Sequence, residues 1–214
     1  MSSNIPLSYG FISAAKPPTV YWVISDLFLV FTPMKSWKQI SNQLIYSSPY
    51  VTVSEDQIEL PSGMKSSWLR IEAPTDGVCV ICFDDQGRIL IVDQYCHPPA
   101  AMVLELPGGK IDPGESPTEA AAREVREETG AVLGNVQILG KFLLNNRRSS
   151  RYCYVATAKV SGMVERSMEP HEDGEVYWMT SDELETLVRE GKVMNQNLLA
   201  AWAIYLQCRP KDQS

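Results

Sequence analysis

The stretch that decides the fold is Glu105–Gly130, which reads ELPGGKIDPGESPTEAAAREVREETG. Ser116, the proline after it and Glu119 form the pattern of a helix start, with an N-cap serine and a glutamate three residues later. Gly130 suits the residue that ends a helix, because glycine adopts the left-handed conformation at little cost. The stretch therefore predicts a helix over 117–129. Two apolar residues fall on its buried side: Ala121 and Val125.

Three glutamates of this helix, Glu124, Glu127 and Glu128, share one face because they are three and four residues apart. A single E-x-x-E-E pattern usually marks a solvated helix face, and Arg123 and Arg126 would offset part of the charge. The full array is more specific, since two glycines precede it and a glycine ends it. Hard cations such as Mg²⁺ and Mn²⁺ prefer carboxylate oxygens. The array therefore favours a metal site at which a diphosphate shares the ions and a water is activated.

The spacing of Gly109, Glu115, the segment 123–128 and Gly130 resembles the signature box of the Nudix hydrolases. These metal-dependent enzymes cleave nucleoside diphosphates linked to another moiety. The resemblance implies an α/β fold, a Nudix-type α/β/α sandwich with a mixed sheet, plus a small N-terminal antiparallel sheet. It departs from the usual box at Ala131, where a larger aliphatic residue is normal.

The resemblance also assigns roles to residues of the box. Glu124 and Glu128 are expected to be the main metal ligands, with Glu127 and the carbonyl of Gly108 as further ligands. Arg123 is expected to orient a box carboxylate. Structural positions complete the box: Gly109, Glu115 and Gly130.

The stretches Gln94–Pro99 and Glu105–Glu115 resemble the ADP-ribose and ADP-sugar diphosphatase branch of that family, and the resemblance covers residues 37–208. In that branch the N-terminal strands form a homodimer and their aromatic residues stack on adenine. Trp68 and Tyr50 lie at suitable positions, although both also suit sheet packing. Glu105 is assigned to the substrate site.

The branch takes its catalytic base from a loop near the last strand. Glu172 is the first candidate and Glu175 the second, so the predicted catalytic set is Glu172, Glu127 and Arg123. The branch often has an arginine where Cys96 stands. The basic loop 145–151 could supply phosphate contacts instead, from Arg147, Arg148 or Arg151, or it could be a solvated loop.

Composition narrows the function further. The 214 residues carry a net charge of -7, which argues against a nucleic-acid surface. The apolar run 19–31 is too short for a membrane span. The five cysteines lack the spacing of a disulfide scaffold, so a reducing, cytoplasmic compartment is expected. Cys79 and Cys82 lie three apart on an expected strand and so face opposite sides, as core residues rather than a metal or redox pair.

We expect three parts in the chain: an N-terminal extension (1–36), a β subdomain (37–73) and the Nudix domain (74–214). The extension either precedes a natural start at Met34 or adds a helix that packs on the domain or a partner. Short strands are expected in the β subdomain at 44–46, 50–53, 57–60 and 67–71. Further strands are expected at 78–83, 89–94, 102–106, 136–144, 152–160 and 176–179, and further helices from Ser181 to about Glu190 and over 197–208.

The function expected from these observations is Mg²⁺-dependent hydrolysis, with Mn²⁺ as a possible substitute, of ADP-ribose or an ADP-sugar to AMP and a sugar phosphate. Alternatives are a Nudix hydrolase for a GDP-sugar, a dinucleoside polyphosphate or a nucleoside triphosphate, and a catalytically silent Nudix-fold binding module. The expected partners are a small nucleotide substrate and a second copy of the chain, with neither nucleic acid nor membrane.

Overall fold

The computed structural model describes residues 22–24, 27–29, 36–167 and 174–209. The chain divides into two compact units. One runs up to Asn42 and includes Asp56–Trp68, and the other comprises Gln43–Glu55 and the chain from Leu69 onward. The predicted boundaries at residues 36 and 73 stay a prediction.

An eight-stranded mixed sheet forms the centre of the second unit. Its main path runs β10 (Ala131–Leu133), β12 (Tyr152–Met163), β6 (Gly77–Phe83), β7 (Ile89–Cys96), β13 (Gly174–Met179). Three further strands pair beside this path: β8 (Ala101–Glu105) on β7, β9 (Gly108–Lys110) on β6, and β11 (Gln137–Leu143) on β12. β12 and β6 are parallel, whereas the other pairs are antiparallel. The expectation of a mixed sheet is confirmed.

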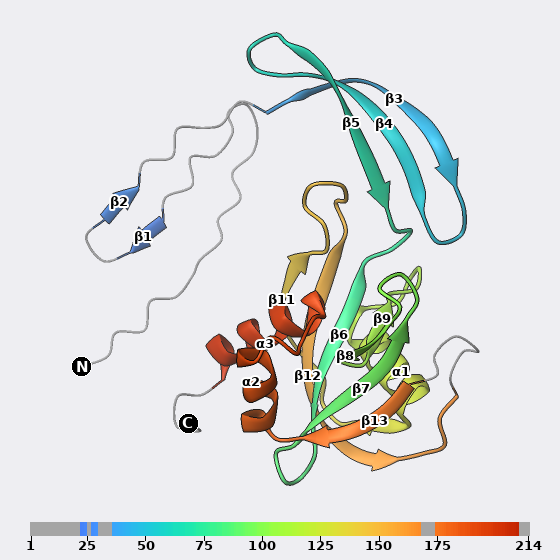
Figure 1. The fold of residues 1–214 in the computed structure, drawn as a ribbon, viewed down its shortest axis with the longest axis vertical. Helices are drawn as coiled ribbons and strands as arrows, with labels where there is room; N and C mark the ends of the chain where they lie inside the picture. Colours follow the sequence, from blue (N-terminus) through green and yellow to red (C-terminus); the bar gives the residue numbers. More distant parts are fainter. Residues whose placement is uncertain (1–21, 25–26, 30–35, 168–173, 210–214) are drawn as a thin grey trace. The chain divides into compact units, whose positions relative to one another are not determined.

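Helices cover both faces of this sheet, as Figure 1 shows: α1 (Pro117–Thr129) on one face, and α2 (Ser181–Arg189) with α3 (Gln196–Cys208) on the other. The alternation of strand β6 explains the two layers, since successive side chains point to opposite faces. Val80 packs with Ala121 and Val125 of α1, whereas Ile81 packs with Leu198 of α3. The predicted α/β/α sandwich is therefore confirmed.

The cysteine prediction follows the same alternation. Cys79 belongs to the core beneath α3 and Cys82 to the core beneath α1, and both are buried free thiols. Burial raises the pKa of the Cys82 thiol, which keeps it protonated and unreactive. These two cysteines are core residues on opposite faces, as predicted.

A separate three-stranded antiparallel sheet comes earlier in the chain, in the order β3 (Lys38–Ser47), β4 (Thr52–Glu59), β5 (Lys65–Glu72). Two expected short strands, at 50–53 and 57–60, proved to be the single strand β4, so the expected break between them was wrong. Ser54, Asp56 and Ile58 are buried on one side of it. The Asp56 carboxylate accepts hydrogen bonds from the amides of Gln39 and Asn42, both at 2.7 Å, which offsets the cost of burying it.

Helix α1 begins and ends as predicted. The Ser116 side chain accepts a hydrogen bond from the Glu119 backbone N–H, and the Glu119 side chain accepts one from the Ser116 N–H. Gly130 ends the helix with φ of 73°, and a Cβ there would lie 2.3 Å from the Val164 carbonyl oxygen. Ala121 and Val125 are fully buried, as expected.

Helix α2 begins at Ser181, as expected, and takes Thr180 as its N-cap, in a capping box with Glu183. In the N-terminal extension, the described residues form two short antiparallel strands, β1 (Trp22–Ile24) and β2 (Leu27–Leu29), where a packed helix was one alternative. Within the described parts of the chain, no helix is long and apolar enough to cross a membrane. The cytoplasmic location stays a prediction.

Candidate active site

The segment of Gly108 and Gly109 before α1, which we call the glycine turn although both residues belong to strand β9, lies directly against two of the predicted metal ligands. The Gly108 N–H donates to a Glu128 carboxylate oxygen at 2.9 Å. A Cβ built on Gly109 would lie 2.6 Å from the carboxyl carbon of Glu124, so only glycine leaves room for that side chain. Gly108 has φ of 151°, and a Cβ there would meet the Val78 carbonyl oxygen at 2.1 Å. The turn therefore seats the carboxylates of Glu124 and Glu128 on its backbone.

Arg123 connects the rest of the box. Its Nε and Nη2 donate to the two oxygens of Glu115, both at 2.9 Å, and Nη2 also donates to the Lys110 carbonyl at 2.9 Å. Its Nη1 lies 2.9 Å from Glu124 and 3.2 Å from Glu127. The bonds to Glu115, followed by those to Glu124 and Glu127, raise the pKa of Arg123 despite partial burial. The hydrogen bonding between Arg123 and Glu115 also lowers the pKa of Glu115. One guanidinium thus orients three carboxylates and ties α1 to β9.

The donor set fits a divalent cation. Glu124, Glu127 and Glu128 offer carboxylate oxygens, the hard ligands that Mg²⁺ and Mn²⁺ prefer. Glu124 is buried, at 9% exposure, and shares Arg123 with two other glutamates. In this conformation the carboxylates contact protein donors, and no three His, Cys, Asp or Glu side chains in the described ranges converge on one metal position. The ligand assignment, including the Gly108 carbonyl, stays a prediction.

Glu105, assigned to the substrate site, lies at the end of β8. One of its oxygens accepts a hydrogen bond from the Asn195 side chain at 2.8 Å and contacts the Cys96 thiol at 3.5 Å. Burial and the neighbouring Glu105 charge raise the pKa of Cys96. The position at which the related branch has an arginine therefore holds a neutral thiol beside a carboxylate. Sequence reasoning missed Asn195, whose capping of α3 was the available signal.

The basic loop 145–151 is held by Glu72 at the end of β5. Glu72 accepts hydrogen bonds from the hydroxyls of Ser149 at 2.6 Å and Ser150 at 3.1 Å, and from Arg70 at 2.7 Å. Arg151 donates to the Ala73 carbonyl at 2.8 Å. Arg148 donates to the Leu69 carbonyl at 3.1 Å. Two of the three arginines proposed for phosphate contacts therefore support the loop itself, and Arg147 is exposed.

The aromatic candidates each have an aromatic or cationic neighbour within their own unit. Trp68 contacts Trp37 edge to face, with ring centroids 5.3 Å apart. Tyr50 is 72% exposed, and the Lys110 ammonium lies 5.2 Å from its ring. Adenine stacking by either residue stays a prediction.

Of the two candidate bases, Glu172 lies outside the described residues. Glu175 is on β13, where it accepts a hydrogen bond from the Tyr177 hydroxyl. That bond raises the pKa of Tyr177. The base assignment stays a prediction.

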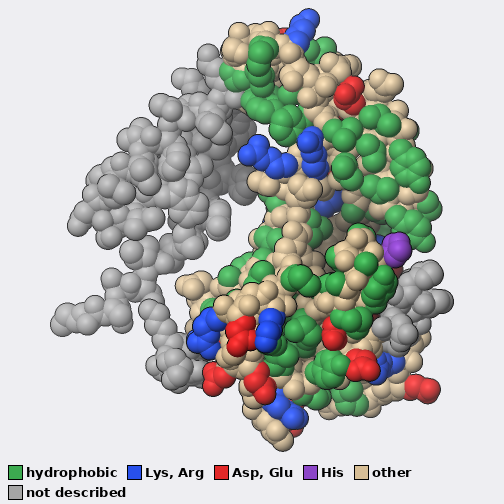
Figure 2. Space-filling view, in the orientation of Figure 1, with side chains coloured by type: hydrophobic (Ala, Val, Ile, Leu, Met, Phe, Trp, Pro, Cys, Tyr) green, Lys and Arg blue, Asp and Glu red, His purple; other side chains and the backbone are tan. Residues whose placement is uncertain are grey.

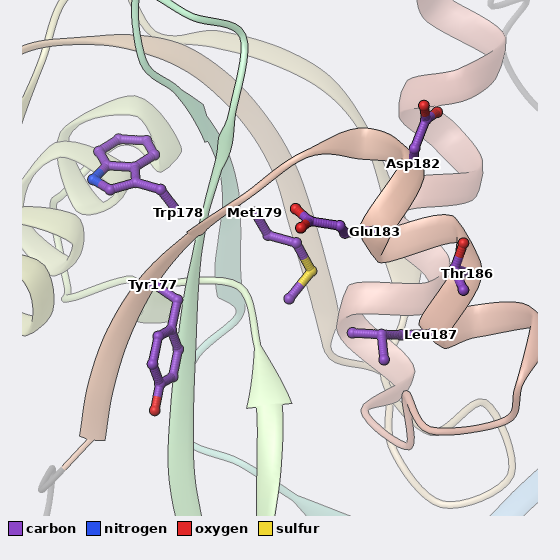
Figure 3. Close-up of a pocket in the computed structure, with 7 residues that line it drawn as sticks. All are labelled: Tyr177, Trp178, Met179, Asp182, Glu183, Thr186 and Leu187. Carbon is purple, nitrogen blue, oxygen red and sulfur yellow. The ribbon is translucent and has the colours of Figure 1, made fainter.

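Two cavities are relevant to the search for a substrate site. A groove of about 520 Å³ lies between β13 and α2, where Figure 3 shows Tyr177 and Met179 on one side of the strand and Trp178 on the other. It includes no residue of the box. A second cavity of about 240 Å³ is lined by Gly108, Gly109 and Glu105. The second cavity therefore shares Gly108 and Gly109 with the box, although no residue of α1 lines it.

A mixed sheet between helices, with a glycine turn that seats glutamates of the following helix, is an arrangement in which a divalent cation could assist the hydrolysis of a phosphoanhydride. The NUDIX domain matches residues 73–201. The chain therefore belongs to the Nudix family, whose members generally need a divalent metal, and it is a Nudix pyrophosphohydrolase.

Individual relatives are similar over most of their length. An ADP-ribose pyrophosphatase of Bacillus subtilis (strain 168) is 30% identical over 180 residues, which are 83% of this chain and 96% of that protein. A CMP-5'-(N-acetyl-N-hydroxy-3-aminopropyl)phosphonate hydrolase of Streptomyces rubellomurinus is 31% identical over 74% of this chain and 76% of its own. A crystal structure of an ADP compounds hydrolase superposes with a TM-score of 0.72 at 19% identity, covering 83% of this chain and 96% of that one. The fold is shared, and relatives of 30% and 31% identity are named for different nucleotide substrates.

The contacts of Glu72 predict an acid-sensitive loop. Burial raises its pKa, but the hydrogen bonds from Ser149, Arg70 and Ser150 outweigh burial and lower it from 4.5 to about 2. A carboxyl group whose pKa is lower in the folded than in the unfolded protein stabilises the fold at pH values above its unfolded pKa. The stabilisation from Glu72 is therefore present above about pH 4.5 and is lost as the pH falls toward 2. We expect Glu72→Gln to lower the free energy of unfolding by about 2 kcal/mol at pH 7, less than the full shift implies because Arg70 is partly solvated.

The measurement is denaturant unfolding of wild type and Glu72→Gln between pH 7 and pH 3. The difference between the two should shrink as the pH falls. The same change at the exposed Glu165 serves as control and should have little effect. A difference that stays constant with pH would show that the Glu72 charge does not hold the loop.

Proposed function

We propose that this protein is a Mg²⁺-dependent diphosphatase that hydrolyses ADP-ribose, or a related ADP-sugar, to AMP and a sugar phosphate. The observation that carries the proposal is the seating of Glu124 and Glu128 on the Gly108–Gly109 backbone. ADP-ribose pyrophosphatases among the relatives, from Bacillus subtilis and Mycobacterium tuberculosis, support the substrate class.

In this mechanism Glu124, Glu127 and Glu128 would hold Mg²⁺. When bound, the ion supplies charge neutralisation on the diphosphate and a more acidic water. Arg123 fixes the rotamers of Glu124 and Glu127, so that the carboxylates need little reorganisation when substrate arrives. Glu115 holds the guanidinium in turn through its two hydrogen bonds. The helix and the glycine turn thus act as one preorganised unit.

The direct test of this mechanism is the hydrolysis of ADP-ribose by Glu128→Gln. Loss of one carboxylate charge should reduce kcat/KM by about a thousandfold, as removal of an electrostatic contact in a catalytic site does. Glu119→Gln is the matched control, because it makes the same change on the same helix and glutamine keeps the capping box. Equal rates of ADP-ribose hydrolysis for wild type and Glu128→Gln would contradict the proposed mechanism.

The substrate itself is tested by a panel of ADP-ribose, an ADP-sugar, a GDP-sugar, a dinucleoside polyphosphate and a nucleoside triphosphate, with product analysis. The highest kcat/KM should fall on ADP-ribose or the ADP-sugar. A preference for another substrate class would leave the assignment as a hydrolase in place and contradict the assignment of an ADP-linked substrate. Failure on every substrate, with Mg²⁺ or Mn²⁺, would favour a silent binding module.

We propose Glu172 as the general base, with Glu175 as the alternative. Glu175 already accepts a hydrogen bond from the Tyr177 hydroxyl, which supports the first choice. Glu172→Gln should lower kcat by about 10²- to 10⁴-fold and leave KM nearly unchanged, the range for loss of a general base. Glu175→Gln is the matched control and should change kcat little. The reverse pattern would assign the base to Glu175.

We propose further that two copies associate through the three-stranded sheet. Strand β3 is exposed along its whole length, and Ile40, Leu44, Ile45 and Tyr46 are each 47–59% exposed. Figure 2 shows hydrophobic side chains gathered on this sheet. Exposed apolar side chains gathered on one strand favour a protein interface. In such a dimer Trp68 and Tyr50 would stack on adenine, and Arg147 and Arg151 would lie near the phosphates.

Sedimentation velocity tests the dimer. Wild type should sediment as a dimer, and Leu44→Asp should shift the population to monomer, because a charge would be buried at the interface. The same type of substitution at an exposed residue outside the three-stranded sheet, Met194→Asp, serves as control. A monomeric wild type at micromolar concentration would contradict the proposal.

A further inference from the structure

Strand β13 is an edge strand of the central sheet. All six of its residues pair with β7, and within the described residues no strand pairs with its other edge, which we call the outer edge. In an antiparallel pair, alternate residues direct their N–H and C=O groups away from the partner strand. At the start of the strand, the Gly174 carbonyl accepts a hydrogen bond from Arg166 at 3.0 Å. An edge of this kind is a template on which another extended chain can pair.

The groove of about 520 Å³ runs along this outer edge. Three consecutive residues of β13 line it: Tyr177, Trp178 and Met179. Successive side chains of a strand point to opposite faces, and Figure 3 shows Trp178 on the opposite side of the strand from the other two. The core contacts agree, because Trp178 packs against the core beneath α1 and Met179 against the core beneath α3. A groove lined from both faces of one strand lies along the edge of that strand.

Helix α2 forms the other wall of this groove. In Figure 3 the side chains of Glu183 and Leu187 extend from the helix toward the strand. Leu187 and Met179 pack against the same core cluster, and the Tyr177 side chain beside them is 41% exposed. The groove therefore places apolar side chains next to the open edge of the sheet.

The charged residues that line the groove are both acidic. They are Asp182 and Glu183, and none of the described residues in the lining is basic. Both hydrogen bonds that Glu183 accepts from Thr180 go to its Oε2. These bonds, first the one from the backbone, lower the pKa of Glu183, so the side chain is ionised at neutral pH. The lining therefore has two negative charges.

Two arginines approach the groove without lining it. The Arg88 guanidinium lies 5.8 Å from the centre of the Trp178 ring, and its charge is offset by an ion pair with Asp84 at 2.7 Å. Arg189 donates a hydrogen bond to the Thr186 hydroxyl at 2.9 Å. One arginine charge thus remains against the two carboxylates of the lining, so the groove favours a cationic partner.

The open edge and this charge together select the kind of occupant. Only an extended backbone can pair with the edge of a strand, because the backbone groups of a helix are bonded within the helix. A second copy of β13 is disfavoured, since it would bring Asp182 and Glu183 of both chains together, and like charges on paired strands destabilise the pair. The features therefore point to a segment of a different protein.

We propose that the outer edge of β13 and this groove bind an extended segment of a partner protein in which Lys or Arg alternates with apolar residues. The segment adds a further strand to the sheet. Its apolar residues face the side of Trp178, and its basic residues face α2, where the carboxylates of Asp182 and Glu183 lie. The aliphatic stems of the basic residues cover Met179 and Leu187.

Fluorescence anisotropy tests the charge preference, with a fluorescein-labelled heptapeptide that alternates lysine and valine and a second one with glutamate in place of lysine. Wild type should bind the lysine peptide at least about tenfold more tightly than the glutamate peptide. Asp182→Lys should weaken binding of the lysine peptide by about tenfold, because an attraction becomes a repulsion. Glu190→Lys is the matched control, since it makes the same change of charge at an exposed position of the same segment outside the groove.

The control also separates the groove from general attraction to a chain with a net charge of -7. Glu190→Lys should bind the lysine peptide nearly as wild type does. Equal weakening in Asp182→Lys and Glu190→Lys, equal affinity of wild type for the two peptides, or no saturable binding would overturn the proposal.

Backbone pairing is tested on wild type alone, with two versions of the lysine peptide that carry N-methyl groups on alternate residues, either odd or even. A strand directs alternate N–H groups to opposite edges, so only one of the two versions should lose binding. Equal binding of both versions, or equal loss, would contradict strand addition. A shift from dimer to monomer in sedimentation velocity of Asp182→Lys would assign the edge to a second copy and overturn the proposal as well.

Discussion

The structure of the site depends on the contact between the Gly108–Gly109 turn and two carboxylates of α1. Glu128 accepts a hydrogen bond from the Gly108 N–H, and Glu124 lies so close to Gly109 that any side chain there would displace it. Negative groups of this density would repel one another on a free helix. The Gly108 N–H and Arg123 hold these carboxylates in place. Two glycines and one arginine of the sequence therefore serve to orient glutamates.

The sandwich supplies the rigidity that this contact needs. Strand β9 carries the turn and pairs with β6, in the register Cys79↔Gly108. Helix α1 packs on β6 through Val125 and Ala121, which are fully buried. Both halves of the contact are therefore fixed to the same central strand, and residues built on regular elements hold a site more accurately than loop residues do.

Local chemistry explains how much of this could be predicted from the sequence. The bounds of α1 were predictable because Ser116, Glu119 and Gly130 carry capping signals within the helix itself. Strand β4 was predicted as two pieces because Asp56 looks like a turn residue, whereas the distant amides of Gln39 and Asn42 offset the cost of burying it. The cavity beside the box was equally hidden, since Thr75, Glu105 and Asn197 are far apart in sequence and meet only through the fold. Short-range patterns thus predict the helix and the acidic face, whereas partners from distant segments determine the cavity.

The most direct measurement is the affinity for Mn²⁺, read by electron paramagnetic resonance, of Gly109→Ala compared with Gly162→Ala. A Cβ at Gly109 would clash with Glu124, whereas one at Gly162 would meet nothing within 4 Å. The account predicts a 10- to 100-fold weaker affinity for Gly109→Ala, the range for a disturbed partner of a metal ligand, and wild-type affinity for Gly162→Ala. Equal affinity in the two variants would contradict the claim that the glycine turn seats the carboxylates of the metal site.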